Sequence, residues 1–146
     1  MPTPRFAVRV GSLIIHFFGS ASPTVLKGNP MHSEQFVDVI KKVVSESAAE
    51  GVISVLNSPP GRRPRAELMA MSAFWHTASG EQKEMINQIV NLAVDNAVFG
   101  FLCVLDGVRA IEDGEDKGAL SLVWRKGDET VVLNQDEDLH DRYNAV

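Results

Sequence analysis

The chain has 146 residues, of which 45% are hydrophobic and 23% are charged, so it is long enough to form one sizeable core and too short for two. Its 14 basic and 19 acidic residues give a net charge of -5. This is the wrong sign for a protein that neutralises phosphates over a broad surface, and general nucleic-acid binding is not expected. The single cysteine, Cys103, excludes an intrachain disulfide and fits a reducing compartment, so we expect a cytoplasmic protein.

The first 30 residues differ in character from the rest, because bases and no acids occur up to Met31. Residues 5–22 resemble a weak signal peptide, because they contain an apolar run with basic flanks. However, His16 interrupts that run. Two alternatives remain. In the first, translation starts at Met31, and residues 1–30 are an extension added in annotation that the native protein lacks. In the second, the run from Phe6 to Phe18 forms a strand or arm that covers a sheet edge or a neighbouring subunit. Residues 31–146 are expected to form a single domain.

The first predicted helix begins at Ser33, a good N-cap residue, and ends at Asn57, before paired prolines. Its apolar residues recur at helical spacing and predict one buried face. They are Phe36, Val39, Ile40, Val43, Val44, Ala48, Val52, Val55 and Leu56.

A second helix is predicted from Pro64, which suits a first helical turn, to about His76. Its apolar stripe consists of Leu68, Met71, Phe74 and Trp75.

A third helix opens with a capping box, in which Ser79 and Gln82 satisfy each other's backbone N–H groups, and it ends near Asp106. Its second half is apolar on almost every side, so it must be central in the core or buried by a partner subunit. We therefore expect self-association, in the simplest case as a homodimer. The longest nearly apolar stretch, Ala97 to Leu105, is far shorter than the roughly 20 residues that cross a bilayer, so no transmembrane helix is predicted.

Beyond the third helix, Gly127 and Asp128 form a two-residue hairpin turn between two short strands. This register sets Trp124 opposite Val131 and predicts an apolar side that packs on the third helix. Acids followed by Leu139 and Tyr143, four residues apart, predict a short final helix. The expected fold is α+β and mainly helical: three main helices packed with a C-terminal β-hairpin and a short final helix.

The C-terminal part of the sequence is acidic, with ten acids and four bases from Glu112 to the end. These acids favour an interaction surface for a basic protein partner, and Asp138 and Asp141 are its candidate binding residues. No metal is expected, because the acids lack the register of an EF-hand loop and the four histidines lack the spacing of a metal site. No cofactor is expected either.

The arginines Arg62, Arg63 and Arg65 are a candidate site for a phosphate or an acidic partner, or else they form a solubilising loop. An alternative to an interaction protein is an enzyme or small-molecule binder with a pocket between the hairpin and the third helix. It would need four side chains to converge on that pocket, with His140 as the acid or base. They are Asp106, Arg109, Trp124 and His140.

The sequence from about Phe74 to the end resembles a family of small bacterial proteins of unknown function. The resemblance is carried by residues 99–114, by residues 118–122 and by the tail, in which Leu139, His140, Asp141 and Tyr143 occur together. It implies no activity and no catalytic residue. From the residues themselves we expect a non-enzymatic cytoplasmic interaction protein with an acidic C-terminal surface, and an immunity or antitoxin-like role is one concrete form of this function.

Overall fold

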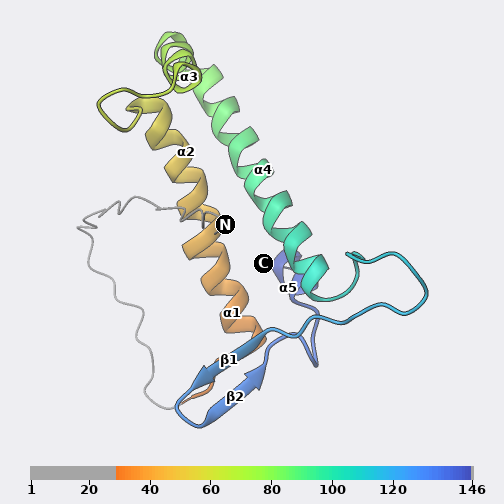
Figure 1. Ribbon diagram of the computed structural model, residues 1–146. Helices are drawn as coiled ribbons and strands as arrows, with labels where there is room; N and C mark the ends of the chain where they lie inside the picture. The colour runs from red at the N-terminus through yellow and green to blue at the C-terminus, as the bar shows by residue number, and fades with distance from the viewer. Residues whose placement is uncertain (1–28, 146) are drawn as a thin grey trace, which may run out of the picture.

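The structure is a computed structural model that describes residues 29–145. The helices are α1 (Ser33–Ile40), η1 (Lys41–Glu46), α2 (Ser47–Asn57), α3 (Ala66–Thr77), α4 (Gly80–Leu105) and α5 (Leu139–Asn144), and the strands are β1 (Val123–Lys126) and β2 (Glu129–Val132). In Figure 1, α1, η1 and α2 form one long rod that runs antiparallel to α4. Helix α3 lies at the upper end of this pair, and α5 and the hairpin lie at the lower end. The fold is mainly helical α+β, as predicted. Residues 1–28 lie outside the described part, so the two alternatives for the N-terminal segment are not addressed.

The predicted N-cap of the first helix is wrong by one residue. His32 precedes α1 and provides no side-chain cap, and Ser33 is the first helical residue. The Ser33 hydroxyl donates instead to the backbone carbonyl of Leu133, at 2.7 Å. This hydrogen bond ties the start of α1 to the end of the hairpin, a partner 100 residues away that local sequence could not reveal.

The predicted single helix is divided by η1, a π-helical segment of six residues. The π-helix bonds each N–H to the carbonyl five residues back, so it widens the backbone and shifts the angular position of every later side chain. The buried side is formed by Val37, Ser45 and Ala49. The single apolar face predicted from α-helical spacing is therefore wrong: Val39, Val43, Val44 and Val52 are each more than 40% exposed.

Helix α3 starts two residues after Pro64, with Arg65 in the extended N-cap position. Of its predicted apolar stripe, Trp75 is buried, but Met71 and Phe74 are more than half exposed. Trp75 Nε1 donates to Asn57 Oδ1 at 2.8 Å, which joins α3 to the last residue of α2.

The capping box of α4 is confirmed. Gln82 N–H donates to Ser79 Oγ at 3.2 Å, and Ser79 N–H donates to Gln82 Oε1 at 2.8 Å. The predicted end is confirmed too, because Leu105 is the last helical residue and Asp106 is the C-cap.

The hairpin has the predicted register, with Trp124 opposite Val131. Gly127 adopts a φ of 60° at the first central position of the turn, where a side chain would be strained. Beyond the strands, Leu133 N–H donates to the Leu122 carbonyl at 2.8 Å, and Leu122 packs against the core.

The core is small and lies where the lower end of α4 meets α1 and α5. Val37, Leu102, Leu139 and Tyr143 form its buried cluster, with Leu122 of the hairpin segment packed against it. The short final helix predicted from Leu139 and Tyr143 is thus confirmed as α5, whose buried residues are Leu139, His140 and Tyr143. Cys103 is buried as a free thiol, as its position in an apolar helix suggested.

Candidate functional site

Two of the four residues proposed for an enzyme site are in contact. Asp106, at the C-terminal end of α4, accepts two hydrogen bonds on Oδ2, both at 2.8 Å. One comes from the backbone N–H of His140, and the other joins the His140 ring at Nδ1. Phe99 packs edge-on against the same ring, at a centroid distance of 5.8 Å. The histidine is therefore held in one orientation, because its backbone, its ring nitrogen and its ring face each have a partner.

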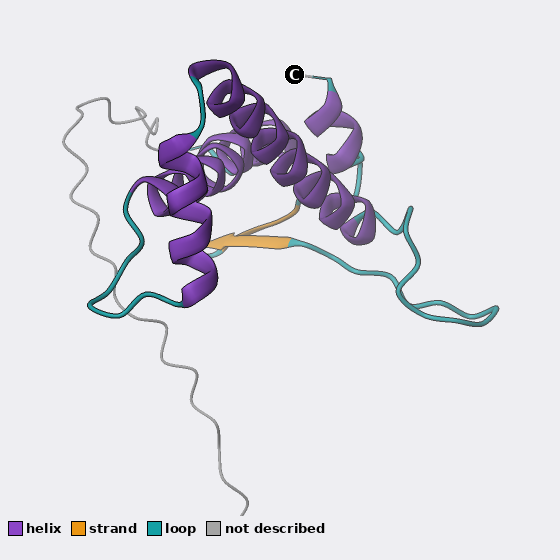
Figure 2. Cartoon of the chain, turned by 90° about the horizontal axis from the view of Figure 1, so that it is seen from above, coloured by secondary structure: helices purple, strands orange, loops and turns teal. Residues whose placement is uncertain are grey.

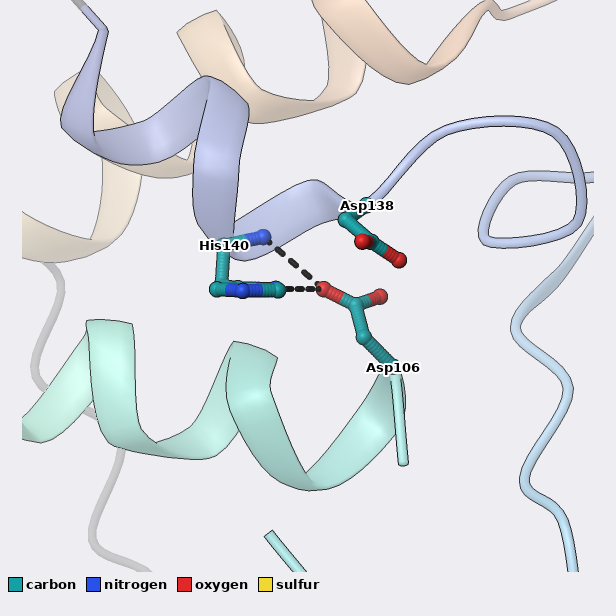
Figure 3. A group of neighbouring side chains, drawn as sticks. All are labelled: Asp106, Asp138 and His140. Atoms are coloured by element: carbon teal, nitrogen blue, oxygen red, sulfur yellow. Dashed lines mark hydrogen bonds and ion pairs between the residues drawn. The ribbon is translucent and has the colours of Figure 1, made fainter. Parts of the chain in front are cut away.

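Asp138 joins this pair, two residues before His140. Ligand atoms of Asp106, Asp138 and His140 all lie within 4.8 Å of one another. The Asp106 side chain is fully buried, and its second oxygen, Oδ1, has no hydrogen-bond partner among the described residues. Figure 3 shows that this oxygen points toward the Asp138 carboxylate. Asp141 lies on the other side of the ring, with Oδ1 at 3.4 Å from His140 Nε2.

Arg109 and Trp124 do not complete an enzyme site. Arg109 lies against α4 instead, where its Nη1 atom would be 2.8 Å from a side-chain carbon added at Gly100. Trp124 is half-buried in β1 and faces Val131 across the hairpin. In residues 29–145, no hydrogen bond or ion pair joins either of them to Asp106 or His140. The structure therefore supplies a hydrogen-bonded Asp–His pair without the convergence that the enzyme alternative requires.

A second polar cluster connects η1, α4 and α5, and sequence analysis missed it. The Tyr143 hydroxyl donates to Asp95 Oδ1 at 2.8 Å and hydrogen-bonds with Ser45 Oγ at 2.6 Å. Loss of hydration on burial raises the pKa of Tyr143; the hydrogen bond to Ser45 opposes this effect, and the hydrogen bond to Asp95 adds to it. The Lys41 ammonium lies 4.9 Å from the centre of the Tyr143 ring. A serine and an aspartate inside apolar helical stretches were the signal available in the sequence, but their partners come from other helices.

The predicted acidic surface is present at the lower end of the molecule. The loop between α4 and β1 extends away from the helices, as Figure 2 shows, and every residue from 110 to 121 is exposed. Two of the acids are engaged locally. Glu112 Oε2 accepts from the Gly118 N–H at 2.8 Å, and Arg142 donates to Glu137, which lowers the pKa of Glu137. Asp113, Glu115, Asp116, Asp136 and Asp138 are exposed and form no ion pair within the described chain.

The arginine cluster lies at the opposite end of α4. Arg62, Arg63 and Arg65 belong to the exposed segment between α2 and α3, which Figure 1 shows at the upper end of α2, on the side away from α4. The three arginines thus lie at one end of the long helix, where Glu67, Glu81 and Glu84 are also exposed, and the C-terminal acids lie at the other end.

An uncovered apolar face extends along α3 and the first half of α4. Met71, Phe74, Met85, Ile89 and Leu92, which we call the apolar face, are each between 54% and 63% exposed. The three residues on α4 follow at i, i+4 and i+7, so they share one side of the helix. Beside them is a hollow of about 400 Å³ lined by Leu56, Ala70, Met71, Phe74, Trp75 and Ile86.

Helix α4 is long and apolar enough to cross a membrane, judged by length and composition alone. No transmembrane helix was predicted, because the uninterrupted apolar run from Ala97 to Leu105 is short and polar residues occur before it. A core helix of a soluble protein passes the same test when it is mostly buried, but only 17% of the most apolar stretch of α4 is buried in this fold. The rest of the described chain therefore buries only a small part of this apolar helix.

No protein family, no curated protein and no solved structure matches this chain. The resemblance noted from the sequence therefore supplies no residue role, and function must be argued from the geometry above.

Proposed function

We propose that the chain is a non-enzymatic cytoplasmic interaction protein. Two copies associate through the apolar face, and the acidic C-terminal surface binds a basic protein partner. The observation that carries this proposal is the exposure of five large apolar side chains on two adjoining helices. Several large apolar side chains left exposed on neighbouring helices are typical of a surface that another molecule covers.

The size of the apolar face suits a second copy of the chain. Five side chains, each a little over half exposed, present on the order of 500 Å² of apolar surface. A standard interface buries about 800 Å² per partner, of which roughly 65% is apolar in homodimers. The two estimates agree, and the adjoining hollow can accept a side chain from the other copy.

The distribution of charge favours an antiparallel pair. If two copies pack along α4 about a two-fold axis, the arginine segment of each copy lies near the acidic end of the other. Three arginines offset only part of the ten acids that follow residue 111, so a surplus of negative charge remains for a basic partner. Complementary charge of this kind speeds association and makes it sensitive to salt.

A bilayer is a poorer match for the same face. The first half of α4 is not apolar all around, because Asn87, Asn91 and Asp95 follow one another at four-residue spacing along one side of it. Asn91 and Asp95 border a polar hollow of about 360 Å³ next to Tyr143. A helix that spans a membrane alone needs apolar side chains all around it, since unpaired polar groups are costly in hydrocarbon.

The association is tested by changing one residue of the apolar face. Ile89→Glu puts a charge at the centre of the face without disturbing the monomer, because Ile89 is 58% exposed. Gln88→Glu is the matched control, with the same new side chain one residue away on a neighbouring side of α4. Sedimentation velocity is expected to show a monomer for Ile89→Glu and a dimer for the control. The proposal would be contradicted if both variants sedimented as the same species. It would also be contradicted if Ile89→Glu only abolished binding of the chain to added lipid vesicles and left its sedimentation unchanged.

The acidic surface is tested with an oligoarginine peptide as a basic probe. Neutralising Asp113, Glu115 and Asp116 to their amides is expected to weaken peptide binding several-fold and to reduce its dependence on salt. The control variant neutralises Glu50, Glu67 and Glu81, which changes the net charge equally at other exposed positions. Fluorescence anisotropy over a range of salt concentrations measures both. Equal losses in the two variants would show that only net charge matters and would remove the role of the C-terminal surface.

A further inference from the structure

We propose that Asp106, Asp138 and His140 hold one divalent metal ion. This site shares Asp138 with the acidic C-terminal surface but includes neither the apolar face nor the loop acids tested above, so its test is separate from theirs. Figure 3 shows the three side chains gathered where the end of α4 meets the start of α5. Their ligand atoms lie within 4.8 Å of one another. Ligands of a tetrahedral ion at about 2.1 Å are roughly 3.4 Å apart, a separation that lies within the 4.8 Å span of these atoms.

The buried carboxylate calls for a cation. Asp106 is fully buried at its side chain, and Oδ1 has no hydrogen-bond donor within the described residues. A buried carboxylate oxygen without a partner is costly, because the hydration it loses is not replaced. That oxygen also faces a second carboxylate, Asp138, so the two negative charges repel each other.

The helix end adds to the same imbalance. Asp106 is the C-cap of a helix of 26 residues, where the aligned peptide dipoles produce a partial negative charge. Acids are disfavoured there and cations are favoured. A divalent ion balances both carboxylates and supplies the missing partner of Oδ1.

The ligand set indicates the class of metal. Two carboxylates and one imidazole suit a transition ion of intermediate softness, such as Zn²⁺ or Mn²⁺, whereas Mg²⁺ and Ca²⁺ prefer oxygen ligands only. Three protein ligands leave the remaining coordination positions to water, and the exposed Asp138 marks the open side of the site. The packing of Phe99 on the His140 ring holds that ligand in place.

The test is calorimetric titration of the full chain with Zn²⁺ after treatment with a chelator. Asp138→Asn is the informative variant, because Asp138 is exposed and makes no hydrogen bond through its side chain among the described residues. Asp136→Asn is the matched control, an exposed aspartate two residues earlier. We expect Asp138→Asn to weaken Zn²⁺ binding at least about tenfold and Asp136→Asn to leave it within about twofold. Mg²⁺ is expected to bind far more weakly than Zn²⁺.

A second readout separates this site from adventitious zinc binding elsewhere. Mn²⁺, a paramagnetic ion, is expected to broaden the backbone NMR signals of residues 106 and 138–141 before all others, in the wild-type chain and not in Asp138→Asn. A Cys103→Ser variant is expected to bind Zn²⁺ as the wild type does. Equal Zn²⁺ affinity in both aspartate variants, no Zn²⁺ binding at all, or first broadening at His32 or His76 would overturn the proposal.

Discussion

At the scale of single residues, the most informative side chain is Tyr143. It is 4% exposed, and its hydroxyl joins three helices through Ser45 of η1 and Asp95 of α4. A hydroxyl at such a position is stabilising only while both partners are present, because a buried polar group without a partner costs more than a normal hydrogen bond contributes.

The ionisation of Tyr143 can be followed alone, because it is the only tyrosine in the chain. Burial raises its pKa, so the folded protein is expected to lose this proton at higher pH than the urea-unfolded chain, whose tyrosine ionises near pH 10. Ultraviolet absorbance of the tyrosinate during a pH titration measures both. Equal midpoints for the folded and unfolded chains would contradict the buried hydroxyl.

The same shift has a consequence for stability, with a definite sign. The unfolded chain ionises first, so the contribution of Tyr143 to the free energy of unfolding is fully present below about pH 10 and is lost as the pH rises toward the higher folded pKa. Above pH 10, the free energy of unfolding is expected to decline less in Tyr143→Phe than in the wild type, because position 143 then cannot ionise. Urea unfolding at a series of pH values measures this difference, and identical slopes for the two proteins would argue against it.

At neutral pH, Tyr143→Phe is expected to lower the free energy of unfolding by about 1–3 kcal/mol, because Ser45 stays buried without its partner. Ser45→Ala tests the coupling. If the two hydroxyls stabilise each other, the double variant loses less than the sum of the single losses. Exact additivity in urea unfolding would show that the 2.6 Å contact has no energetic role.

Prediction of single residues from the sequence succeeded where the residues nearby in the chain determine the environment of a side chain. The spacing of Leu139 and Tyr143 predicted the short final helix, which is α5, and Cys103, which lies in an apolar stretch, is buried. His140 and Asp106 were named as candidates, but their contact could not be derived, because it depends on how α5 docks on α4 across 34 residues.

At the scale of elements, local signals placed the helix ends well. The capping box at Ser79 and the glycine after Asp106 are short-range features, and α4 begins and ends where they predict. The break at η1 was not foreseen, because a π-helical segment needs tertiary partners to compensate for its less favourable backbone. The buried contact of Ser45 with Tyr143 is one such partner.

Two glycines provide an element-scale prediction with opposite signs. Gly51 is exposed within α2 with open space around it, so Gly51→Ala is expected to raise the free energy of unfolding by about 0.5–1 kcal/mol. Gly107 follows α4 with a φ of 77°, a backbone conformation that strains any residue with a side chain. Gly107→Ala is therefore expected to lower the free energy of unfolding by about 1–2 kcal/mol, although there is space for the added methyl group. Thermal unfolding measures both. A loss of stability in Gly51→Ala would contradict an unbroken helix at that position.

At the scale of the whole molecule, the sequence pattern predicted the α+β class correctly. It predicted self-association from the apolar character of the third helix. The structure buries Gly100, Leu102 and Cys103 of the second half within the chain itself, and the exposed apolar side chains on which we base the proposed association lie on the first half. Which residues stay exposed was not predictable, because it depends on the angle at which the rod of α1, η1 and α2 packs beside α4.

The measurement that tests the central claim most directly is the solution mass of the full chain, by gel filtration coupled to light scattering over a dilution series. Association through the apolar face predicts twice the chain mass of 16.0 kDa at high concentration. It also predicts dissociation on dilution that is stronger at high salt, because the two charged ends then attract each other less. A mass of one chain at every concentration would contradict the account and leave the apolar face without a second copy.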